Sequence, residues 1–299
     1  MNEKVLERST ATFKSLTISY SLITKPGIIM GNAITTVGGF ALASKNHFNF
    51  WLLLAAIAGL SLIIASACVF NNCIDREHDE KMARTKDRAL ALKLITNRRA
   101  IIFATLLVIF GTFILTVYVN FLAVAIALFG FFVYVILYSF LKYRSVHATL
   151  IGSIAGSVPP VVGYCAATNH FDIGAFVLFI MMAIWQMPHF FAIAIYRLED
   201  YAKASIPVLP LIKSIFITKI QMLLYIAAYI IISSMLTLLN YSGYAFLITA
   251  ALMGISWLFL CMKGFTCKND RSWARKMFFF SLIVIISTSG LLLLNPFLF

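Results

Sequence analysis

Acidic residues and long polar stretches are scarce in this chain. Only 11 of its 299 residues are Asp or Glu, against 24 Lys and Arg, and 62% of the residues are apolar. This composition lies far outside the balance of a soluble globular domain. Apolar runs of about 20 residues, the length that crosses the hydrocarbon core of a bilayer as a helix, recur along the whole sequence instead. The chain is therefore predicted to be an integral membrane protein.

Cysteine is also rare, and recognisable targeting signals are missing. The five cysteines show no C-x-x-C spacing, so neither a zinc site nor a disulfide framework is indicated. No apolar stretch with a small-residue cleavage site precedes the first span, and Glu3 and Glu7 argue against a mitochondrial transit peptide. We expect a bacterial cytoplasmic (inner) membrane protein, with an organellar protein already trimmed to its mature form as the alternative.

The apolar runs predict an all-α bundle of about nine transmembrane helices. A β-barrel is excluded because the long runs lack a period of two. The longest polar interval, 71–99, is too short for an independent core, so residues 1–299 are predicted to form a single transmembrane domain. The predicted spans are 20–43, 48–70, 100–120, 121–141, 149–168, 173–196, 214–239, 242–262 and 277–298.

The distribution of Lys and Arg predicts the orientation of the bundle. With nine spans, one side of the membrane receives the basic residues of the N-terminus and of four loops, at 71–99, 142–148, 197–213 and 263–276. The other side receives only Lys45. By the positive-inside rule the N-terminus is cytoplasmic and the C-terminus lies on the opposite side. Because the charges are spread through short loops, anionic lipid of the bilayer explains them better than nucleic acid does.

One short sequence carries the pattern of a metal site. Asn71, Asp75 and Asp79 are four residues apart at the end of the second span. On an α-helix such residues drift only about 80° around the axis over roughly 12 Å, so they share one face. Several oxygens on one face suit Mg²⁺, which binds one or two carboxylates and completes its shell with water and substrate phosphate. The predicted ligand is a diphosphate, and the predicted site faces the cytoplasm.

Cationic and acidic residues near other span ends are candidates for the same site. Arg84 and Lys86 follow the first motif, and Lys or Arg neutralise phosphate oxygens. Tyr196 and Asp200, also four apart, end the sixth span and are followed by Lys203. If the second and sixth spans meet, Asp200 completes a ring of carboxylates opposite Asp75 and Asp79.

Further polar residues stand at the cytoplasmic ends of other spans or inside one. Lys25, Tyr138 and Lys142 either contact a ligand or anchor their helices at the interface. His189, inside the sixth span, either ligates a metal or haem iron or packs beside Pro188. His147 raises the same question at the end of the fourth loop.

At this point the motifs resemble a known family. Asn71-x-x-x-Asp75-x-x-x-Asp79 is similar to the first signature of the membrane-embedded aromatic prenyltransferase superfamily, whose members have nine membrane helices. Within it, the chain resembles the protohaem IX farnesyltransferase (haem O synthase) family over nearly its whole length. The strings that carry this resemblance are Thr24–Gly27, Asn71–Arg88, Gly156–Pro160, Trp185–Phe190, Asp200–Tyr201 and Ile206–Pro210. Tyr196 replaces the first acid of the superfamily's second signature, as in the haem branch.

The resemblance implies a reaction and a set of roles. The farnesyl group of farnesyl diphosphate would join a vinyl group of haem b with addition of water, giving haem O and diphosphate for terminal oxidase haem biosynthesis. The implied cofactor is Mg²⁺, held by Asn71, Asp75, Asp79 and Asp200. The implied diphosphate contacts are Lys25, Arg84, Lys86, Lys142 and Lys203, with Tyr138 and Tyr196 orienting the group. Asp75, Asp79, Asp200 and Tyr196 would be catalytic, and His189 and His147 are the candidates for binding haem.

Two alternative functions and one question about partners stay open at this stage. One keeps the enzyme class but makes an aromatic quinone precursor the acceptor. Another is a multi-span transporter for an anionic solute, against which the absence of an internal repeat and the clustering of acids at one face count. The third concerns partners: a downstream haem-modifying enzyme or a terminal oxidase is the candidate that would receive the product.

Overall fold

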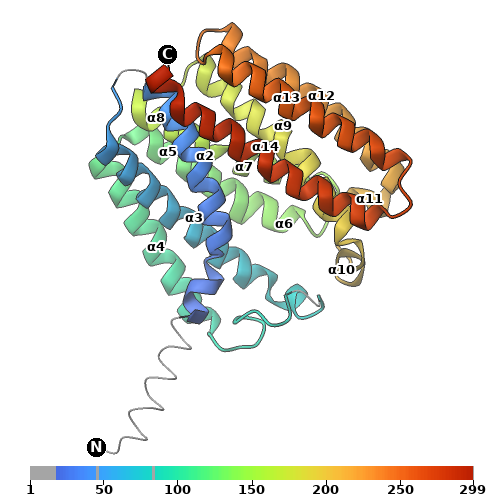
Figure 1. Cartoon of the computed structure of the whole chain (residues 1–299). Coiled ribbons are helices and arrows are strands. Elements are labelled where there is room, and N and C mark those ends of the chain that lie inside the picture. The colour runs from blue at the N-terminus through green and yellow to red at the C-terminus, as the bar shows by residue number, and fades with distance from the viewer. Residues whose placement is uncertain (1–17, 45–46, 83–84, 299) are drawn as a thin grey trace, which may run out of the picture.

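The computed structural model describes residues 18–44, 47–82 and 85–298, and every regular element within these ranges is helical (Figure 1). Nine segments of this described part are long and apolar enough to cross a membrane. The predicted all-α architecture with nine spans is therefore confirmed. The spans are Pro26–Ser44 (α2), Phe50–Asp79 (α3), Asn97–Tyr118 (α4), Phe121–Leu141, Ala148–Thr168, Ile173–Tyr196 (α9), Ile215–Leu238 (α12), Tyr244–Phe265 and Asp270–Leu294, the last within α14 (Asp270–Leu298).

Several spans are composite, and short helices join others. The fourth span consists of α5 (Phe121–Phe132), a π-helix η1 (Val133–Tyr138) and α6 (Ser139–Leu141). The fifth consists of α7 (Ala148–Gly156) and α8 (Val158–Thr168), and the eighth of α13 (Tyr244–Met262) and the 3₁₀ turn η2 (Lys263–Phe265). Between α9 and α12 lie α10 (Leu198–Lys203) and α11 (Leu209–Ile212).

Polar side chains fix where five of the spans begin. In each, a side-chain oxygen just before the helix accepts a hydrogen bond from a backbone N–H of the first turn, which would otherwise lack a partner. An unpaired N–H is costly beside the hydrocarbon core, so these caps define the helix starts. The capping residues are Asn49, Thr96, Asn120, Asp172 and Ser214, for α3, α4, α5, α9 and α12 respectively.

A glycine lets the first span pack closely against the fifth. Helix α2 packs against both α8 and α14, while α9 packs against α12 and α14. At the α2–α8 crossing, a Cβ added to Gly39 would lie 1.9 Å from the carbonyl oxygen of Pro160. Only glycine permits this approach of two backbones, as is typical of helix contacts in membranes.

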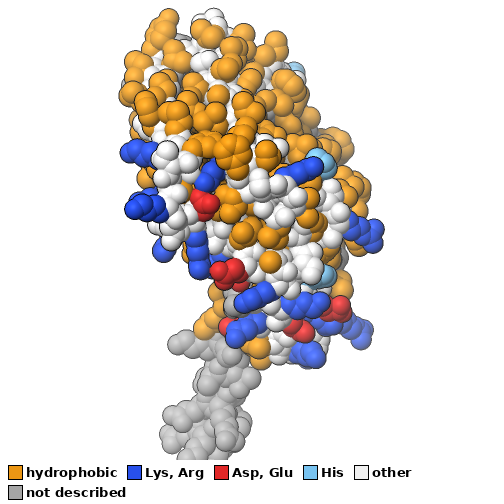
Figure 2. Space-filling model, turned by 90° about the vertical axis from the view of Figure 1, so that its right-hand side faces the viewer, with side chains coloured by type: hydrophobic (Ala, Val, Ile, Leu, Met, Phe, Trp, Pro, Cys, Tyr) orange, Lys and Arg blue, Asp and Glu red, His pale blue; other side chains and the backbone are white. Residues whose placement is uncertain are grey.

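The surface separates an apolar region from a charged end. Many large apolar side chains are exposed along α4, α12 and α13, as expected for groups that face lipid. Figure 2 shows hydrophobic side chains covering the upper part of one face, whereas Lys, Arg, Asp and Glu gather towards the other end. The end of α3, the loop after it and α10 lie at this charged end, opposite the end of α14 (Figure 1).

Two helix boundaries differ from the sequence prediction in ways that matter for function. Helix α3 continues to Asp79, nine residues beyond the predicted end of the second span, so the whole first motif is helical. Helix α14 begins at Asp270 rather than at 277, which brings Arg271 and Arg275 into the last span. Both extensions are charged segments that hydropathy alone assigns to loops.

Candidate active site

The first motif forms a buried polar face at the end of α3. Asn71, Asp75 and Asp79 are only 2%, 7% and 2% exposed. They lie on one helix at the predicted four-residue spacing. Burying two carboxylates is costly unless each has a compensating partner, so their contacts define the site.

Asp75 is held by two groups that follow α6. Lys142 forms an ion pair with its carboxylate, and the Tyr143 hydroxyl donates a 2.6 Å hydrogen bond to Oδ1. Burial lowers the pKa of Lys142 and the neighbouring Asp75 opposes that shift. Burial and then the Asp75 charge raise the pKa of Tyr143, so its hydroxyl remains a donor. The Tyr143 ring stacks on His78 at 3.8 Å between centroids, which fixes its orientation.

Asp79 is held by Arg88, from the loop that follows α3. The Arg88 guanidinium donates to Asp79 Oδ2 at 2.7 Å and to Asn72 Oδ1 at 3.3 Å. Asn72 in turn donates to the Ile23 carbonyl at 2.8 Å, and the Thr85 hydroxyl donates to the Asp79 carbonyl at 3.0 Å. The loop thus folds back on the helix end. Arg88 was not among the predicted ligands, because nothing in its spacing from Asp79 indicates the return of the loop.

Lys25, a predicted diphosphate contact, joins the cluster from the residue just before α2. Its Nζ donates to Asn71 Oδ1 at 2.8 Å, and Asn71 Nδ2 donates to Ser139 Oγ at 3.1 Å. Lys25 has a φ of 56°, a left-handed backbone conformation that is unfavourable for a side chain of this kind. Pro26 interrupts the helical hydrogen bonding at this point and allows the turn that aims Lys25 inward. Burial lowers the pKa of Lys25 to about 8.

The π-helix η1 lies just before the residues of the fourth span that contact the polar cluster of α3. Its wider turns precede Ser139 and Lys142, both of which contact residues of α3. Tyr138, another predicted site residue, has the Lys142 Nζ 5.5 Å from its ring centroid. π-Helical segments are rare and recur at functional sites. Sequence periodicity does not reveal this one, because all six of its residues are apolar or aromatic.

The charges of the cluster suit a polyanion bound together with a metal. Three cations, Lys25, Arg88 and Lys142, face two carboxylates, so one positive charge is in excess. The oxygens of Asn71, Asp75 and Asp79 are hard donors of the kind that Mg²⁺ prefers. The residues present therefore fit a magnesium diphosphate.

The second predicted signature lies elsewhere than expected. Tyr196, Asp200 and Lys203 line a cavity of about 580 Å³ at the ends of α9, α10, α12 and α14. Asp200 pairs with Arg197, one turn earlier, at 3.9 Å. Within the described residues no group of three His, Cys, Asp or Glu side chains could hold a metal, so the expected ring of carboxylates with Asp75 and Asp79 is not formed.

The two signature segments nevertheless approach each other. Met82, after α3, forms an apolar cluster with Ala204 and Ile206, after α10, and the rings of Tyr143 and Tyr201 pack against it. The backbone of α10 therefore stands beside the α3 site. The Asp200 side chain instead pairs with Arg197, which immediately precedes α10 and lies one turn away.

The remaining predicted residues divide between the surface and the interior. Lys86 and His147 are exposed, and Arg84 lies outside the described residues. His189, on α9, packs against α14, and its ring centroid lies 5.0 Å from those of both Trp185 and Phe278. Its Nδ1 lies 2.7 Å from Ser281 Oγ, whose own hydrogen is directed to the Phe278 carbonyl at 2.6 Å. Ser281 therefore accepts from Nδ1–H, which leaves the lone pair on Nε2.

Comparison with known proteins agrees with this geometry. The profile of the UbiA prenyltransferase family matches residues 32–283. The chain belongs to this family. It is 52% identical over 266 residues to the protoheme IX farnesyltransferase of Protochlamydia amoebophila (strain UWE25), covering 89% of the chain and 94% of that relative. It is 50% identical over 271 residues to the protoheme IX farnesyltransferase of Edwardsiella ictaluri (strain 93-146), covering 90% and 92%.

Solved structures show the same UbiA fold at low sequence identity. A digeranylgeranylglyceryl phosphate synthase superposes with a TM-score of 0.79 at 18% identity, covering 96% of this chain and all of that one. A UbiA homologue from Archaeoglobus fulgidus bound to GPP and Mg²⁺ superposes with a TM-score of 0.68 at 12% identity, covering 92% and 99%. The chain is thus a multi-pass membrane prenyltransferase by family and by fold.

Proposed function

We propose that this prenyltransferase moves the farnesyl group of farnesyl diphosphate onto a vinyl group of haem b, giving haem O. The observation that carries the proposal is the buried cluster at the end of α3, where two carboxylates meet three cations. The acceptor follows from the sequence identity of about 50% with protoheme IX farnesyltransferases, which extends over nearly the whole chain. This similarity favours haem over a quinone precursor, and the enzyme family disfavours a transporter.

Asn71, Asp75 and Asp79 are the residues that would hold Mg²⁺. Their oxygens are buried, share one helix face and match its preference for hard ligands. When bound, the metal would neutralise negative charge on the diphosphate as it leaves. The A. fulgidus homologue bound to GPP and Mg²⁺ supports a role for Mg²⁺, while the choice of these three residues rests on their position and burial.

The cations of the cluster would bind the leaving diphosphate. Lys25, Arg88 and Lys142 reach the site from three different segments, so together they surround the end of α3. Held there before reaction, they stabilise the charge that develops as the allylic C–O bond breaks. Tyr138 flanks Lys142 and would orient the same group. Lys86, Lys203 and Arg84 remain predicted contacts of the diphosphate, and Asp200 remains a predicted contact of the metal.

The bond changes at the acceptor balance without an oxidant. The allylic carbon of the farnesyl group joins the terminal carbon of the vinyl group, and diphosphate leaves with the electron pair of the broken C–O bond. Water then adds its oxygen to the other vinyl carbon and loses a proton. We propose that His189 contacts the haem through Nε2, since Ser281 holds the ring by Nδ1. His147 is the weaker candidate because it is exposed.

The setting of this reaction is also proposed. The chain would act as one transmembrane domain in the bacterial cytoplasmic membrane, with the N-terminus and the α3 site at the cytoplasmic face. The gathering of charged side chains at the end of the molecule that carries the site supports this orientation (Figure 2). A downstream haem-modifying enzyme or a terminal oxidase is the proposed recipient of the product.

The decisive experiment compares two site variants with a matched control. Purified protein is incubated with haem b, farnesyl diphosphate and Mg²⁺, and the farnesylated, hydroxylated haem is measured by mass. Asp75→Asn and Asp79→Asn should lose at least roughly a hundredfold in rate, as expected for groups that stabilise the transition state. Glu77→Gln, on the same helix with its side chain 81% exposed, should retain full rate. Prenylation of a hydroxybenzoate acceptor with haem untouched would refute the proposed substrate.

A further inference from the structure

A second cationic site surrounds Tyr196, outside the cluster at the end of α3. The guanidinium carbons of Arg197, Arg271 and Arg275 lie 4.5, 5.8 and 6.0 Å from the centre of the Tyr196 ring. Two of these arginines come from the first turns of α14 and one from the end of α9. The charges on the three side chains repel one another, so their convergence at one ring requires either stacking or a shared anion.

Two acids near this arginine cluster already have cationic partners, one outside the cluster and one within it. Asp270 accepts from Lys219 at 2.5 Å, and Asp200 pairs with Arg197. The ion pairs among the described residues include neither Arg271 nor Arg275. Glu199 is the third acid of the cavity lining, which also includes Arg197, Lys203 and Arg271, whereas Arg275 lies outside the lining beside the same tyrosine. Three acids and three cations line the cavity, and the nearby Lys219, which pairs with Asp270, and Arg275 bring the local total to five cations against three acids. The cavity volume of about 580 Å³ is that of a small-molecule site.

Arginine stacked on an aromatic ring keeps its edge available to a ligand. The flat face of the guanidinium lies against the ring while its N–H groups stay in the plane, where they match the two oxygens of a carboxylate. Arg271 and Arg275 are exposed, so their donors are open to the surroundings. The Tyr196 ring therefore orders the arginines without supplying a negative charge.

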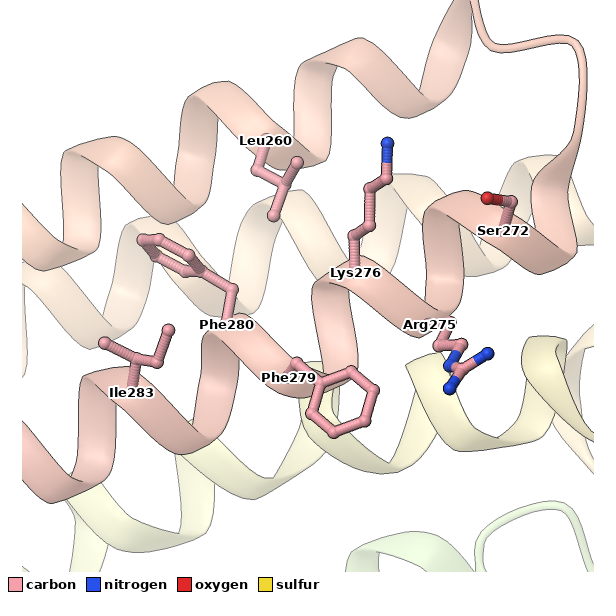
Figure 3. A pocket seen from close by; sticks show the side chains of 7 residues that line it. All are labelled: Leu260, Ser272, Arg275, Lys276, Phe279, Phe280 and Ile283. Carbon is pink, nitrogen blue, oxygen red and sulfur yellow. The ribbon is translucent and has the colours of Figure 1, made fainter.

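The arginine cluster is aligned with His189 along the contact between α9 and α14. Tyr196 and His189 are seven residues apart, which places them on one face of α9 about 10 Å apart. On α14 the same holds for Arg271, Arg275 and Phe278, and Phe278 contacts the His189 ring. In Figure 3, Arg275 and Phe279 point from α14 towards α9, whereas Lys276 lies on the α13 side. A ligand bound along the contact between α9 and α14 would have the arginines at one end and His189 two helical turns away at the other.

We propose that the cluster of Arg197, Arg271 and Arg275 around Tyr196 binds the carboxylates of the acceptor. The inference rests on haem b being that acceptor, because its two propionates would lie at the arginines while its macrocycle extends towards His189. The alternative anions are the diphosphate of the donor and the phosphate of an acidic lipid. The donor already has a site of oxygens and cations at the end of α3, so the carboxylates of the acceptor match this second cluster better.

Titration with haem b and its dimethyl ester tests the proposal. The ester keeps the iron, ring and vinyl groups but has no propionate charge. Wild-type protein should bind the free acid at least roughly tenfold more tightly than the ester, since hydrogen bonds between charged groups are the strong ones. Arg271→Gln and Arg275→Gln should lose this preference, and the KM for haem should rise by about the same factor. Lys276→Gln, one residue away on the other side of α14, should behave as wild type.

The outcomes separate this proposal from the proposed function. If wild-type protein neither binds nor farnesylates haem, the proposed acceptor is wrong. If it farnesylates haem and its ester equally well, or if both arginine variants keep the preference, the arginine cluster does not bind carboxylates. A loss of affinity for farnesyl diphosphate in these variants would assign the cluster to the donor. An equal loss in Lys276→Gln would indicate a general effect of charge at the lipid surface, and would also overturn the proposal.

Discussion

Replacing Lys142 by methionine should destabilise the protein, and Mg²⁺ should reverse part of the loss. The Lys142 and Asp75 side chains are only 11% and 10% exposed, so solvent screens their ion pair little. Removing one partner of a buried pair leaves an uncompensated charge and costs about 3–5 kcal/mol. Tyr143 still donates to Asp75 in the variant, which places the expected loss near the lower end, about 3 kcal/mol.

The reversal follows from the proposed role of Asp75 as a metal ligand. In the structure the ammonium of Lys142 compensates the carboxylate, and a divalent cation would take over that role in the variant. Mg²⁺ should therefore stabilise Lys142→Met more than it stabilises the wild type. The double variant with Asp75→Asn should recover most of the stability, because neither charge remains buried, and should no longer respond to Mg²⁺.

The assay is equilibrium unfolding in mixed detergent micelles, with and without Mg²⁺. Arg144→Met serves as the control, since this exposed cation lies two residues from Lys142. It should change the free energy of unfolding by less than about 0.5 kcal/mol. Equal responses of wild type and Lys142→Met to Mg²⁺ would refute the argument that the metal and the lysine compensate the same carboxylate. A large loss in Arg144→Met would show that any cation of this loop matters, whatever its partner.

Three further outcomes follow from the same structure. Arg88→Gln should raise the KM for farnesyl diphosphate about 10- to 100-fold in steady-state kinetics, because it removes a charged donor from the site; an unchanged KM would exclude Arg88 from binding the donor. Removal of divalent cations with EDTA should stop turnover, and Mg²⁺ should restore it; activity in EDTA would contradict metal dependence. Gly39→Ala should lower the free energy of unfolding by about 1–3 kcal/mol or more, since the added Cβ would meet a backbone oxygen. Gly31→Ala should be tolerated, because the space beside Gly31 is open. Equal effects of the two substitutions would refute the close contact at Gly39.

The fold was predictable because hydropathy and length alone determine most of it. Each apolar run must pair its own backbone groups within lipid, which requires a helix, and so the nine predicted spans recur in the structure. The charged ends were less predictable. Helix α14 starts seven residues earlier than the apolar pattern does, because Asp270–Lys276 is helical although polar. Hydropathy measures preference for lipid, and it does not register helix that continues into the interface.

The candidate site was predictable where its residues share one helix. Asn71, Asp75 and Asp79 follow a spacing that the α-helix converts directly into a common face. Arg88 and Tyr143 were missed because sequence periodicity does not show their contacts. Arg88 reaches Asp79 only because the loop after α3 folds back, and Tyr143 reaches Asp75 from the turn after η1 and α6. The prediction of Asp200 opposite the first motif depended instead on the second and sixth spans meeting in the bundle. Arg197, just before its helix, is a cation one turn away, and Asp200 pairs with it in the structure.

The tyrosine at position 196 has a physical rationale if the arginine cluster binds the acceptor. A carboxylate there would stand among Arg197, Arg271 and Arg275 and would neutralise them from within the chain. The aromatic ring attracts the same cations through its face and carries no charge, so the cluster keeps its capacity for an external anion. An enzyme whose acceptor brings two carboxylates gains from this substitution, whereas one with an uncharged acceptor does not. On this argument Tyr196 selects the acceptor, and the metal site at the end of α3 serves the donor alone.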